Sequence, residues 1–225
     1  MPQLSLYHAE ASPPCRTVRM LAHTIGLDLQ LVDVDMLQEE HRKPEFVKMN
    51  PQHQVPVLGD NGFYLSESRA IIGYLVDNYA EDDSLYPRDP KRRATVNRML
   101  FFDAGTLWMS YSDYQMPIFY GQPGDPEKEK KLMAAFETFD KLLDGKEWAT
   151  GSHVTIADYA LAVTTSSAEW SGVDLKAYSN VCRWLDRVKK AIPCFDEINN
   201  SSFAALKELL QKLTEKLAQM SLNKQ

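Results

Sequence analysis

The sequence of 225 residues contains only three cysteines, Cys15, Cys182 and Cys194. They are odd in number and widely spaced, which favours reduced thiols in the cytosol over a disulfide framework. No Cys-x-x-Cys or His-Glu-x-x-His spacing is present, so nothing in the sequence indicates a metal site. We therefore expect a fold held together by its hydrophobic core, without disulfides or a bound metal.

Long apolar runs and dense basic runs are also absent. No segment approaches the roughly 18 consecutive apolar residues of a membrane span, and the opening residues, MPQLSLYHAE, lack the basic and apolar regions of a secretory signal. The formal net charge of −6 argues against a nucleic-acid-binding protein, and Lys128–Lys131 (KEKK) reads as a solvated helix face. These absences predict a cytoplasmic protein that binds neither membranes nor nucleic acids.

Two kinds of secondary-structure pattern divide the chain. In residues 1–81 a strand at Leu4–His8, a helix at Cys15–Ile25 and a strand at Leu29–Val34 predict an α/β domain. The polar, proline-containing segment 82–90 reads as a linker. Residues 91–225 predict an all-helical domain, with helices at 91–119, 127–144, 155–170, 178–190 and 203–219.

The stretch from residue 50 to residue 72 combines three local signals. Val55-Pro56 ends one short apolar run, and Asp60-Asn61-Gly62 is a tight hairpin turn that leads to a second run. Ser66-Glu67-Ser68-Arg69 then opens an amphipathic helix, Ala70–Tyr79. A helix N-terminus presents unpaired N–H groups and the positive end of a dipole, so this stretch predicts a site for a small anionic ligand.

A second motif, Ser12-Pro13-Pro14-Cys15, places a hydroxyl between a predicted strand and a predicted helix. A serine near the positive end of that helix can donate a hydrogen bond to a thiolate, and the dipole also favours the thiolate over the thiol. Taken alone, Ser12 is better interpreted as a helix cap, because serine before proline is common at helix starts. Because the first position of the motif is serine, dithiol exchange through it is excluded. A reactive Cys15 is the less favoured alternative.

Together, these two motifs resemble those of the cytosolic glutathione transferases, in particular the insect delta and epsilon classes. The resemblance rests on Ser12-Pro-Pro-Cys and on NPQHxVPxLxDxGxxxxESRAI, which begins at Asn50, and it extends over about residues 1–200. Glu-Ser-Arg looks more like delta and Ser-Pro-Pro more like epsilon, so the class stays open. The resemblance implies a thioredoxin-like N-terminal domain, a C-terminal helical bundle, a homodimer, and glutathione as cosubstrate with no other cofactor.

The resemblance also implies roles for residues near the two helix starts. Ser12 would stabilise the glutathione thiolate. Ser68 and the N–H groups that begin its helix suit the γ-glutamyl carboxylate, Glu67 suits the ammonium group, and Arg69 adds positive charge beside them.

Four further residues would complete the glutathione site. His41 and His53 would meet the glycyl carboxylate. The backbone of Val55 would pair in strand fashion with the cysteinyl amide, beside a cis bond at Pro56. His41 lies in a charged stretch and, taken alone, reads as a solvated loop residue.

The helical half offers an apolar pocket for an electrophile. Aromatic and methionine side chains there could face the sulfur, although ordinary helix-bundle core is the alternative for each. The candidates are Trp108, Tyr111, Met116, Phe119, Tyr120 and Phe203. The leucines of the C-terminal segment share one face, which could dock on the helical domain, cover the site or meet a partner. Thr155 and Asp158 have the spacing of a capping box.

These features predict a glutathione transferase that conjugates glutathione to hydrophobic electrophiles. The resemblance implies detoxification, including insecticide metabolism, with peroxidase or dehydrohalogenase reactions as side activities. The alternative is a non-catalytic ligand-binding protein that kept the fold.

Overall fold

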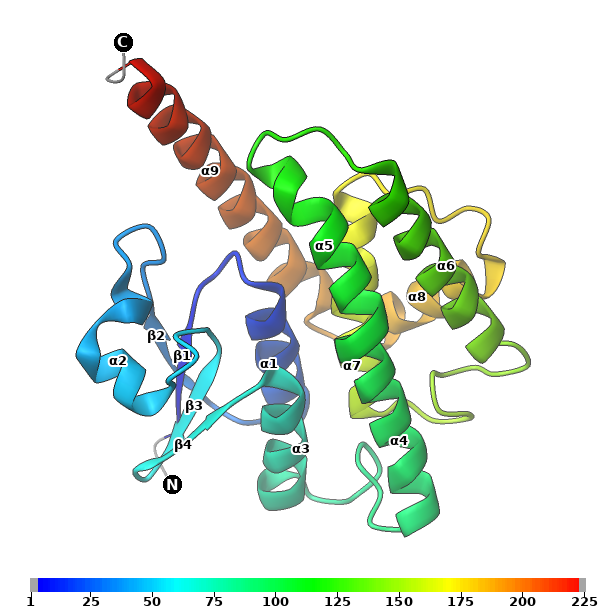
Figure 1. Ribbon diagram of the computed structural model, residues 1–225. Helices are drawn as coiled ribbons and strands as arrows, with labels where there is room; N and C mark the ends of the chain where they lie inside the picture. Colours follow the sequence, from blue (N-terminus) through cyan, green and yellow to red (C-terminus); the bar gives the residue numbers. More distant parts are fainter. Residues whose placement is uncertain (1–3, 223–225) are drawn as a thin grey trace.

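The computed structural model describes the backbone of residues 4–222 and the side chains of residues 4–215. The N-terminal part contains a four-stranded sheet in the order β2-β1-β3-β4 (Figure 1). The strands are β1 Leu4–His8, β2 Gln30–Asp33, β3 Val57–Asp60 and β4 Phe63–Ser66. β1 and β2 are parallel, whereas β3 is antiparallel to both β1 and β4. This topology confirms the predicted thioredoxin-like α/β fold.

Helices cover both faces of this sheet. α1 (Pro13–Thr24) and α3 (Ser68–Tyr79) lie on one face and the short α2 (Pro44–Met49) lies on the other (Figure 1). Successive strand residues point to opposite faces, so Leu4 and Leu6 enter the core shared with α1 and α3, while Tyr7 packs toward Phe46 of α2. The sequence analysis missed α2 and the 3₁₀ turn η1 (Glu40–Arg42), because both are short and lie in a charged stretch.

The hairpin between β3 and β4 has the predicted turn. Asn61 and Gly62 have φ values of 48° and 88°, the left-handed conformations that a two-residue hairpin turn of type I′ requires. The predicted end of the preceding apolar run at Val55-Pro56 was wrong, because β3 begins after it, at Val57. Proline cannot donate to a sheet, which explains why the strand starts only beyond Pro56.

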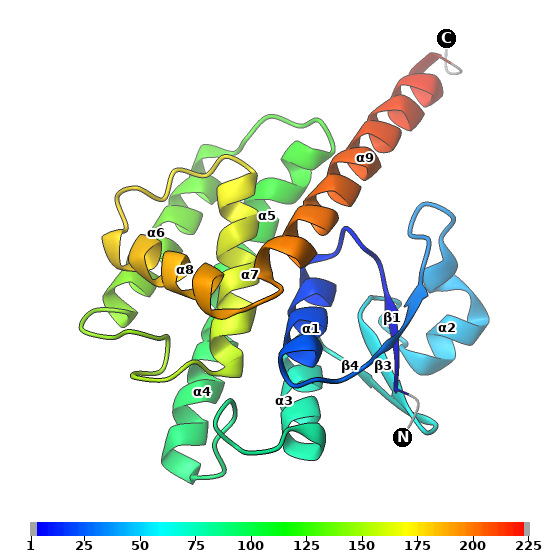
Figure 2. The ribbon, with the colours of Figure 1, turned by 180° about the vertical axis from the view of Figure 1, so that it is seen from behind.

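The C-terminal part is entirely helical among the described residues. Its elements are α4 Pro90–Phe102, η2 Asp103–Leu107, α5 Trp108–Phe119, α6 Pro126–Leu142, α7 Ile156–Trp170, α8 Ser179–Ala191 and α9 Phe195–Leu222. The single helix predicted over 91–119 is interrupted by η2, a π-helical turn. The last helix begins at Phe195, eight residues earlier than predicted, and its C-terminal half extends beyond the other helices (Figure 2). No helix within residues 4–222 is long and apolar enough to cross a membrane.

The predicted capping box at the start of α7 is confirmed. The Asp158 carboxylate accepts hydrogen bonds from the backbone N–H of Thr155 and of Ala149 and from the indole N–H of Trp184, each at 2.8 Å. This carboxylate therefore ties α8 and the loop before α7 to the first turn of α7. One continuous hydrophobic core joins the two parts of the chain, with α1 packed against α3, α7 and α9.

Candidate functional site

The N-terminus of α3 is an uncapped helix end. Glu67 occupies the N-cap position with φ 70° and ψ 104°, its side chain caps no backbone N–H, and no acidic residue lies in the first turn. A non-glycine residue at positive φ costs about 1–3 kcal/mol, and such residues cluster at functional sites. The free N–H groups of the first turn make this end of α3 suitable for an anion.

The loop before β3 is held by the buried side chain of Asn50. Its amide nitrogen donates to the Gln54 carbonyl at 2.9 Å, and its side-chain oxygen accepts from the Gln52 N–H at 3.1 Å. The Val55-Pro56 bond at the end of this loop is cis, as the sequence analysis expected. Asn50 was not proposed as a site residue, although it opens the motif on which the resemblance rests.

A cavity of about 160 Å³ lies between this loop and the start of α3. It brings together the predicted residues Val55, Pro56, Glu67, Ser68 and Arg69. Its other lining residues are Pro14, Asn50, Gln52, Gln54, Ser66, Ala104 and Trp108. The cavity therefore touches the first turn of α1, the hairpin, the first turn of α3 and the helical half of the chain.

The Arg69 side chain crosses to the helical half. Its Nε and Nη2 atoms donate to Oδ2 of Asp103 at 2.9 and 2.5 Å, and the Thr164 hydroxyl donates to Oδ1 at 2.7 Å. Asp103 is 0% exposed, and burial raises the pKa of its carboxyl while the Arg69 guanidinium opposes that rise. Arg69 lines the cavity, and its charge is paired with Asp103, a partner that sequence reasoning missed.

Ser12 is the N-cap residue of α1, and its side chain caps no backbone N–H of the helix. The structure therefore does not support the alternative that the Ser12 side chain serves as an ordinary helix cap. Burial raises the pKa of the neighbouring Cys15 thiol to about 11, although a hydrogen bond with Ser12 opposes the shift. Cys15 is fully buried and stays protonated at neutral pH, which argues against a reactive thiol at this position.

His41 and His53 lie beside each other, with ring centroids 6.2 Å apart. His41 belongs to η1 and is buried, contrary to its interpretation as a solvated loop residue, while His53 is exposed and has φ 46°. The pKa of His41 is lowered, first by burial and then by the positive charges of Arg42 and His53. Neither histidine is among the residues that line the 160 Å³ cavity.

Comparison with known proteins identifies this arrangement. Residues 6–83 match the family model described as glutathione S-transferase, N-terminal domain, and residues 104–191 match the corresponding C-terminal domain. A delta-class glutathione transferase of Nilaparvata lugens is 42% identical, with a TM-score of 0.88, and the match covers 93% of this chain and 99% of that one. The chain belongs to the glutathione S-transferase family.

Two further solved glutathione transferases are similar to this one. Glutathione transferase E6 from Drosophila melanogaster is 32% identical with a TM-score of 0.84, over 94% of this chain and 97% of that chain. A diazinon-metabolizing glutathione S-transferase from the silkworm Bombyx mori is 34% identical with a TM-score of 0.83, over 91% of this chain and 98% of that chain. The neighbours of this glutathione transferase are therefore insect delta- and epsilon-class enzymes, which confirms the resemblance.

The six candidates for the electrophile pocket of this glutathione transferase lie in four different places. Trp108 lines the 160 Å³ cavity beside the residues that were predicted to bind glutathione. Tyr111 was predicted for the pocket but lies in the hydrophobic core, where its hydroxyl donates to the Ser167 carbonyl at 3.2 Å. Met116 and Tyr120 are 44% and 50% exposed near the end of α5.

Phe119 is half-buried at the same helix end. Phe203 stacks on Trp170, with ring centroids 5.1 Å apart and an interplanar angle of 4°. Its other contact is the Arg16 guanidinium, 4.4 Å from the ring centroid. The structure thus places Phe203 against α1 and α7. Of the six candidates, only Trp108 lines the 160 Å³ cavity.

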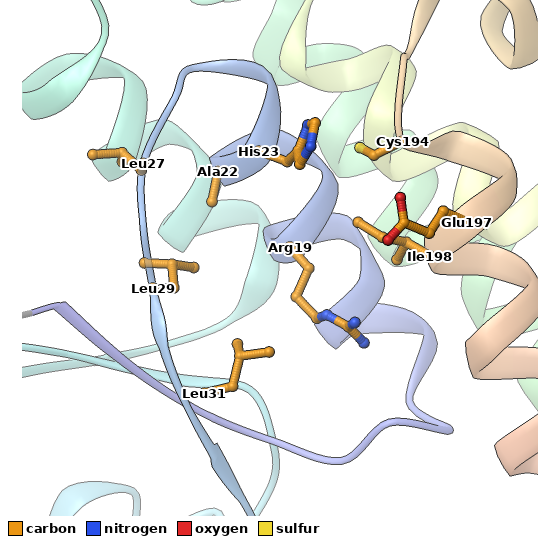
Figure 3. A pocket seen from close by; sticks show the side chains of 9 residues that line it. All are labelled: Arg19, Ala22, His23, Leu27, Leu29, Leu31, Cys194, Glu197 and Ile198. Atoms are coloured by element: carbon orange, nitrogen blue, oxygen red, sulfur yellow. The ribbon is translucent and has the colours of Figure 1, made fainter.

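A second cavity, of about 220 Å³, lies between α1, β2 and the start of α9 (Figure 3). Its lining residues are Arg19, Ala22, His23, Leu27, Leu29, Leu31, Cys194, Glu197 and Ile198. None of these was predicted to bind glutathione or an electrophile. No group of histidine, cysteine and acidic side chains suited to a metal ion occurs among the described residues.

Proposed function

We propose that this glutathione transferase conjugates the glutathione thiolate to small hydrophobic electrophiles. The observation that carries the proposal is the 160 Å³ cavity, in which the uncapped start of α3, the first turn of α1 and Trp108 of the helical half meet. An anionic peptide held at the start of α3 would have its thiol directed toward Trp108 and toward the first turn of α1, which Ser12 precedes; Ser12 itself is not among the residues that line the cavity. Holding two reactants together in this way contributes to the rate by itself.

Glutathione has two carboxylates, one ammonium group and one thiol, and the site offers a group for each. The free N–H groups of α3 and the buried Ser68 hydroxyl suit the γ-glutamyl carboxylate, and the exposed Glu67 carboxylate suits the ammonium group. The Val55 backbone, adjacent to the cis bond, suits the cysteinyl amide. His41 and His53 are our candidates for the glycyl carboxylate.

Ser12 would donate a hydrogen bond to the thiolate while remaining a hydroxyl itself. A thiol with a pKa of about 8.5 is mostly protonated at neutral pH. Lowering this pKa by two units corresponds to about 2.7 kcal/mol and makes the thiolate the dominant form. The support for this role is the position of Ser12 at the N-cap of α1, where the helix dipole acts in the same direction and the hydroxyl is not used as a cap.

The class of electrophile is proposed from the relatives. The diazinon-metabolizing silkworm neighbour supports a role in detoxification that includes insecticides, with peroxidase or dehydrohalogenase reactions as side activities. The higher identity to the delta-class neighbour, 42% against 32% for the Drosophila E6 enzyme, favours the delta class. We further propose a cytoplasmic homodimer, with residues 1–81 as the glutathione domain, 82–90 as the linker and 91–225 as the electrophile domain.

The test is conjugation of glutathione to a chloronitrobenzene by the wild type and by Ser12→Ala across a range of pH. We expect turnover by the wild type, and in the variant a lower rate with the pH profile displaced upward. Ser12→Thr, which keeps a hydroxyl, is the matched control and should retain part of the rate. Binding of glutathione without turnover of any electrophile would favour the ligand-binding alternative, and an unshifted profile in Ser12→Ala would remove Ser12 from the mechanism.

A further inference from the structure

Arg16 is a buried cation without an acidic partner among the described residues. The side chain is 1% exposed and donates only to neutral groups, Oδ1 of Asn199 at 2.8 Å and Oγ of Ser167 at 2.5 Å. Its guanidinium also lies over the ring of Phe203, and its Nε has no hydrogen-bond partner. A buried charge is ordinarily paired with an opposite charge, because desolvation is otherwise costly.

Two other arginines that are at least half-buried, Arg69 and Arg19, do have acidic partners. Arg69 is paired with Asp103, and Arg19 with Glu10 at 2.5 Å. Asn199, an isostere of aspartate, stands where an acid would neutralise Arg16. The fold therefore retains a positive charge at this position instead of cancelling it.

Arg16 lies one helical turn from the proposed thiolate-stabilising group. Its backbone N–H donates to the carbonyl of Ser12 at 3.2 Å, so the two residues are four apart on the first turn of α1. Residues four apart share one face of a helix, and helical side chains lean toward the N-terminus. The Arg16 side chain consequently covers the turn that Ser12 begins.

We propose that Arg16 is a positioning residue for the reaction, which supplies an uncancelled positive charge to the thiol site and thereby favours the glutathione thiolate held by Ser12. This inference rests on the proposed function of that site. The charge acts through the protein interior, where screening by water is weak, and Arg16 makes no contact with the substrate. Asn199 and Ser167 hold the guanidinium in place by hydrogen bonds, and because both are uncharged they do not offset its positive charge.

The groups that face Arg16 leave its charge intact at neutral pH. Burial lowers the pKa of Arg16 to about 10, so it stays protonated, while burial raises the pKa values of Cys15 and of Tyr111 from α5, so both stay neutral. From α7 and α9 the facing groups are uncharged. Glu10 and Arg19, which lie near the start of α1, form an ion pair and largely cancel each other.

The experiment titrates the ultraviolet thiolate absorbance of glutathione bound to the full-length enzyme. The matched pair is Asn199→Asp, which gives Arg16 an acidic partner but loses the amide donor to the Phe195 carbonyl, and Asn199→Ala, which loses that donor and the acceptor for Arg16 without adding charge. We expect Asn199→Asp to raise the pKa of the bound thiol by about one unit, for charges on the order of 10 Å apart at an effective dielectric constant of about 20. Asn199→Ala should leave that pKa unchanged even if the protein is less stable.

Two further variants separate this inference from the role of Ser12. Arg16→Met should raise the pKa of the bound thiol as Asn199→Asp does. Arg16→Lys keeps the positive charge, so its thiol pKa should stay close to that of the wild type. Equal thiol pKa values in Asn199→Asp and Asn199→Ala would overturn the inference, whether or not Arg16→Met folds. A shift with Ser12→Ala but none with Asn199→Asp would refute only the role of Arg16. The absence of a lowered thiol pKa in the wild type would refute the proposed function as well.

Discussion

Replacing Arg69 by methionine should destabilise the protein strongly, because it leaves the fully buried Asp103 carboxylate without its cation. Asp103 would keep only the hydrogen bond from Thr164, at 2.7 Å. Removing one partner of a buried ion pair costs about 3–5 kcal/mol, since an uncompensated charge remains in the interior. We therefore expect the free energy of unfolding of Arg69→Met to fall by about that amount at pH 8.

The loss of folding stability in Arg69→Met should become larger as pH rises. The pKa of Asp103 is already raised by burial, and removal of Arg69 takes away the charge that opposes this rise. The folded variant then holds a proton on Asp103 that the unfolded chain releases above a pH of about 3.9. Its stability should thus decrease as pH rises toward the folded pKa, and lowering the pH from 7 to 5 should restore up to about 2.7 kcal/mol.

The assay is urea unfolding followed by tryptophan fluorescence at pH 5, 7 and 8. Arg69→Met/Asp103→Asn removes both charges and should recover much of the loss, with little pH dependence. Lys141→Met is the surface control: it breaks the exposed pair with Glu137, for which a loss of at most about 0.5 kcal/mol is expected. A loss in Arg69→Met below about 1 kcal/mol, or the same loss at every pH, would refute the view that Asp103 is a desolvated carboxylate held by Arg69.

Two other predictions concern His41 and Cys15. Because the pKa of free His41 is lowered, a carboxylate bound beside it should raise that pKa, so S-methylglutathione should bind with proton uptake and with an affinity that falls as pH rises. Calorimetry in buffers of different ionisation enthalpy measures the uptake, and its persistence in His41→Gln would place the glycyl carboxylate elsewhere. Since the pKa of Cys15 is about 11, this thiol should resist maleimide at neutral pH until the protein unfolds. Cys15→Ala should retain conjugating activity within about two-fold, and a large loss would revive the reactive-thiol alternative.

The features that sequence reasoning anticipated are those whose causes are local. The type I′ turn follows from Asn61-Gly62, and the capping box follows from the spacing of Thr155 and Asp158. The cis bond before Pro56 was expected only through the family resemblance, since an X–Pro bond alone has a small cis probability.

The features that sequence reasoning missed depend on contacts between distant segments. Asp103 reads as an ordinary helix residue until the fold brings it to Arg69, which is 34 positions away. Arg16 meets Asn199 across 183 positions. Tyr111 was assigned to the pocket because aromatic residues suit pockets and cores equally, and only the packing of α5 against α7 decides between them.

Asp103 and Arg16 each make a further hydrogen bond to the same turn of α7. Thr164 holds Asp103 and, through it, Arg69 at the start of α3, while Ser167 holds Arg16 at the start of α1. Residues three apart share one face of a helix, so a single turn of α7 holds the first turns of both helices at which we propose that glutathione binds. These contacts give a role to two of the buried hydroxyl residues of α7, Thr164 and Ser167. In this arrangement the helical half of the chain sets the relative position of the proposed carboxylate site at α3 and the proposed thiol site at α1, in addition to contributing Trp108 to the cavity.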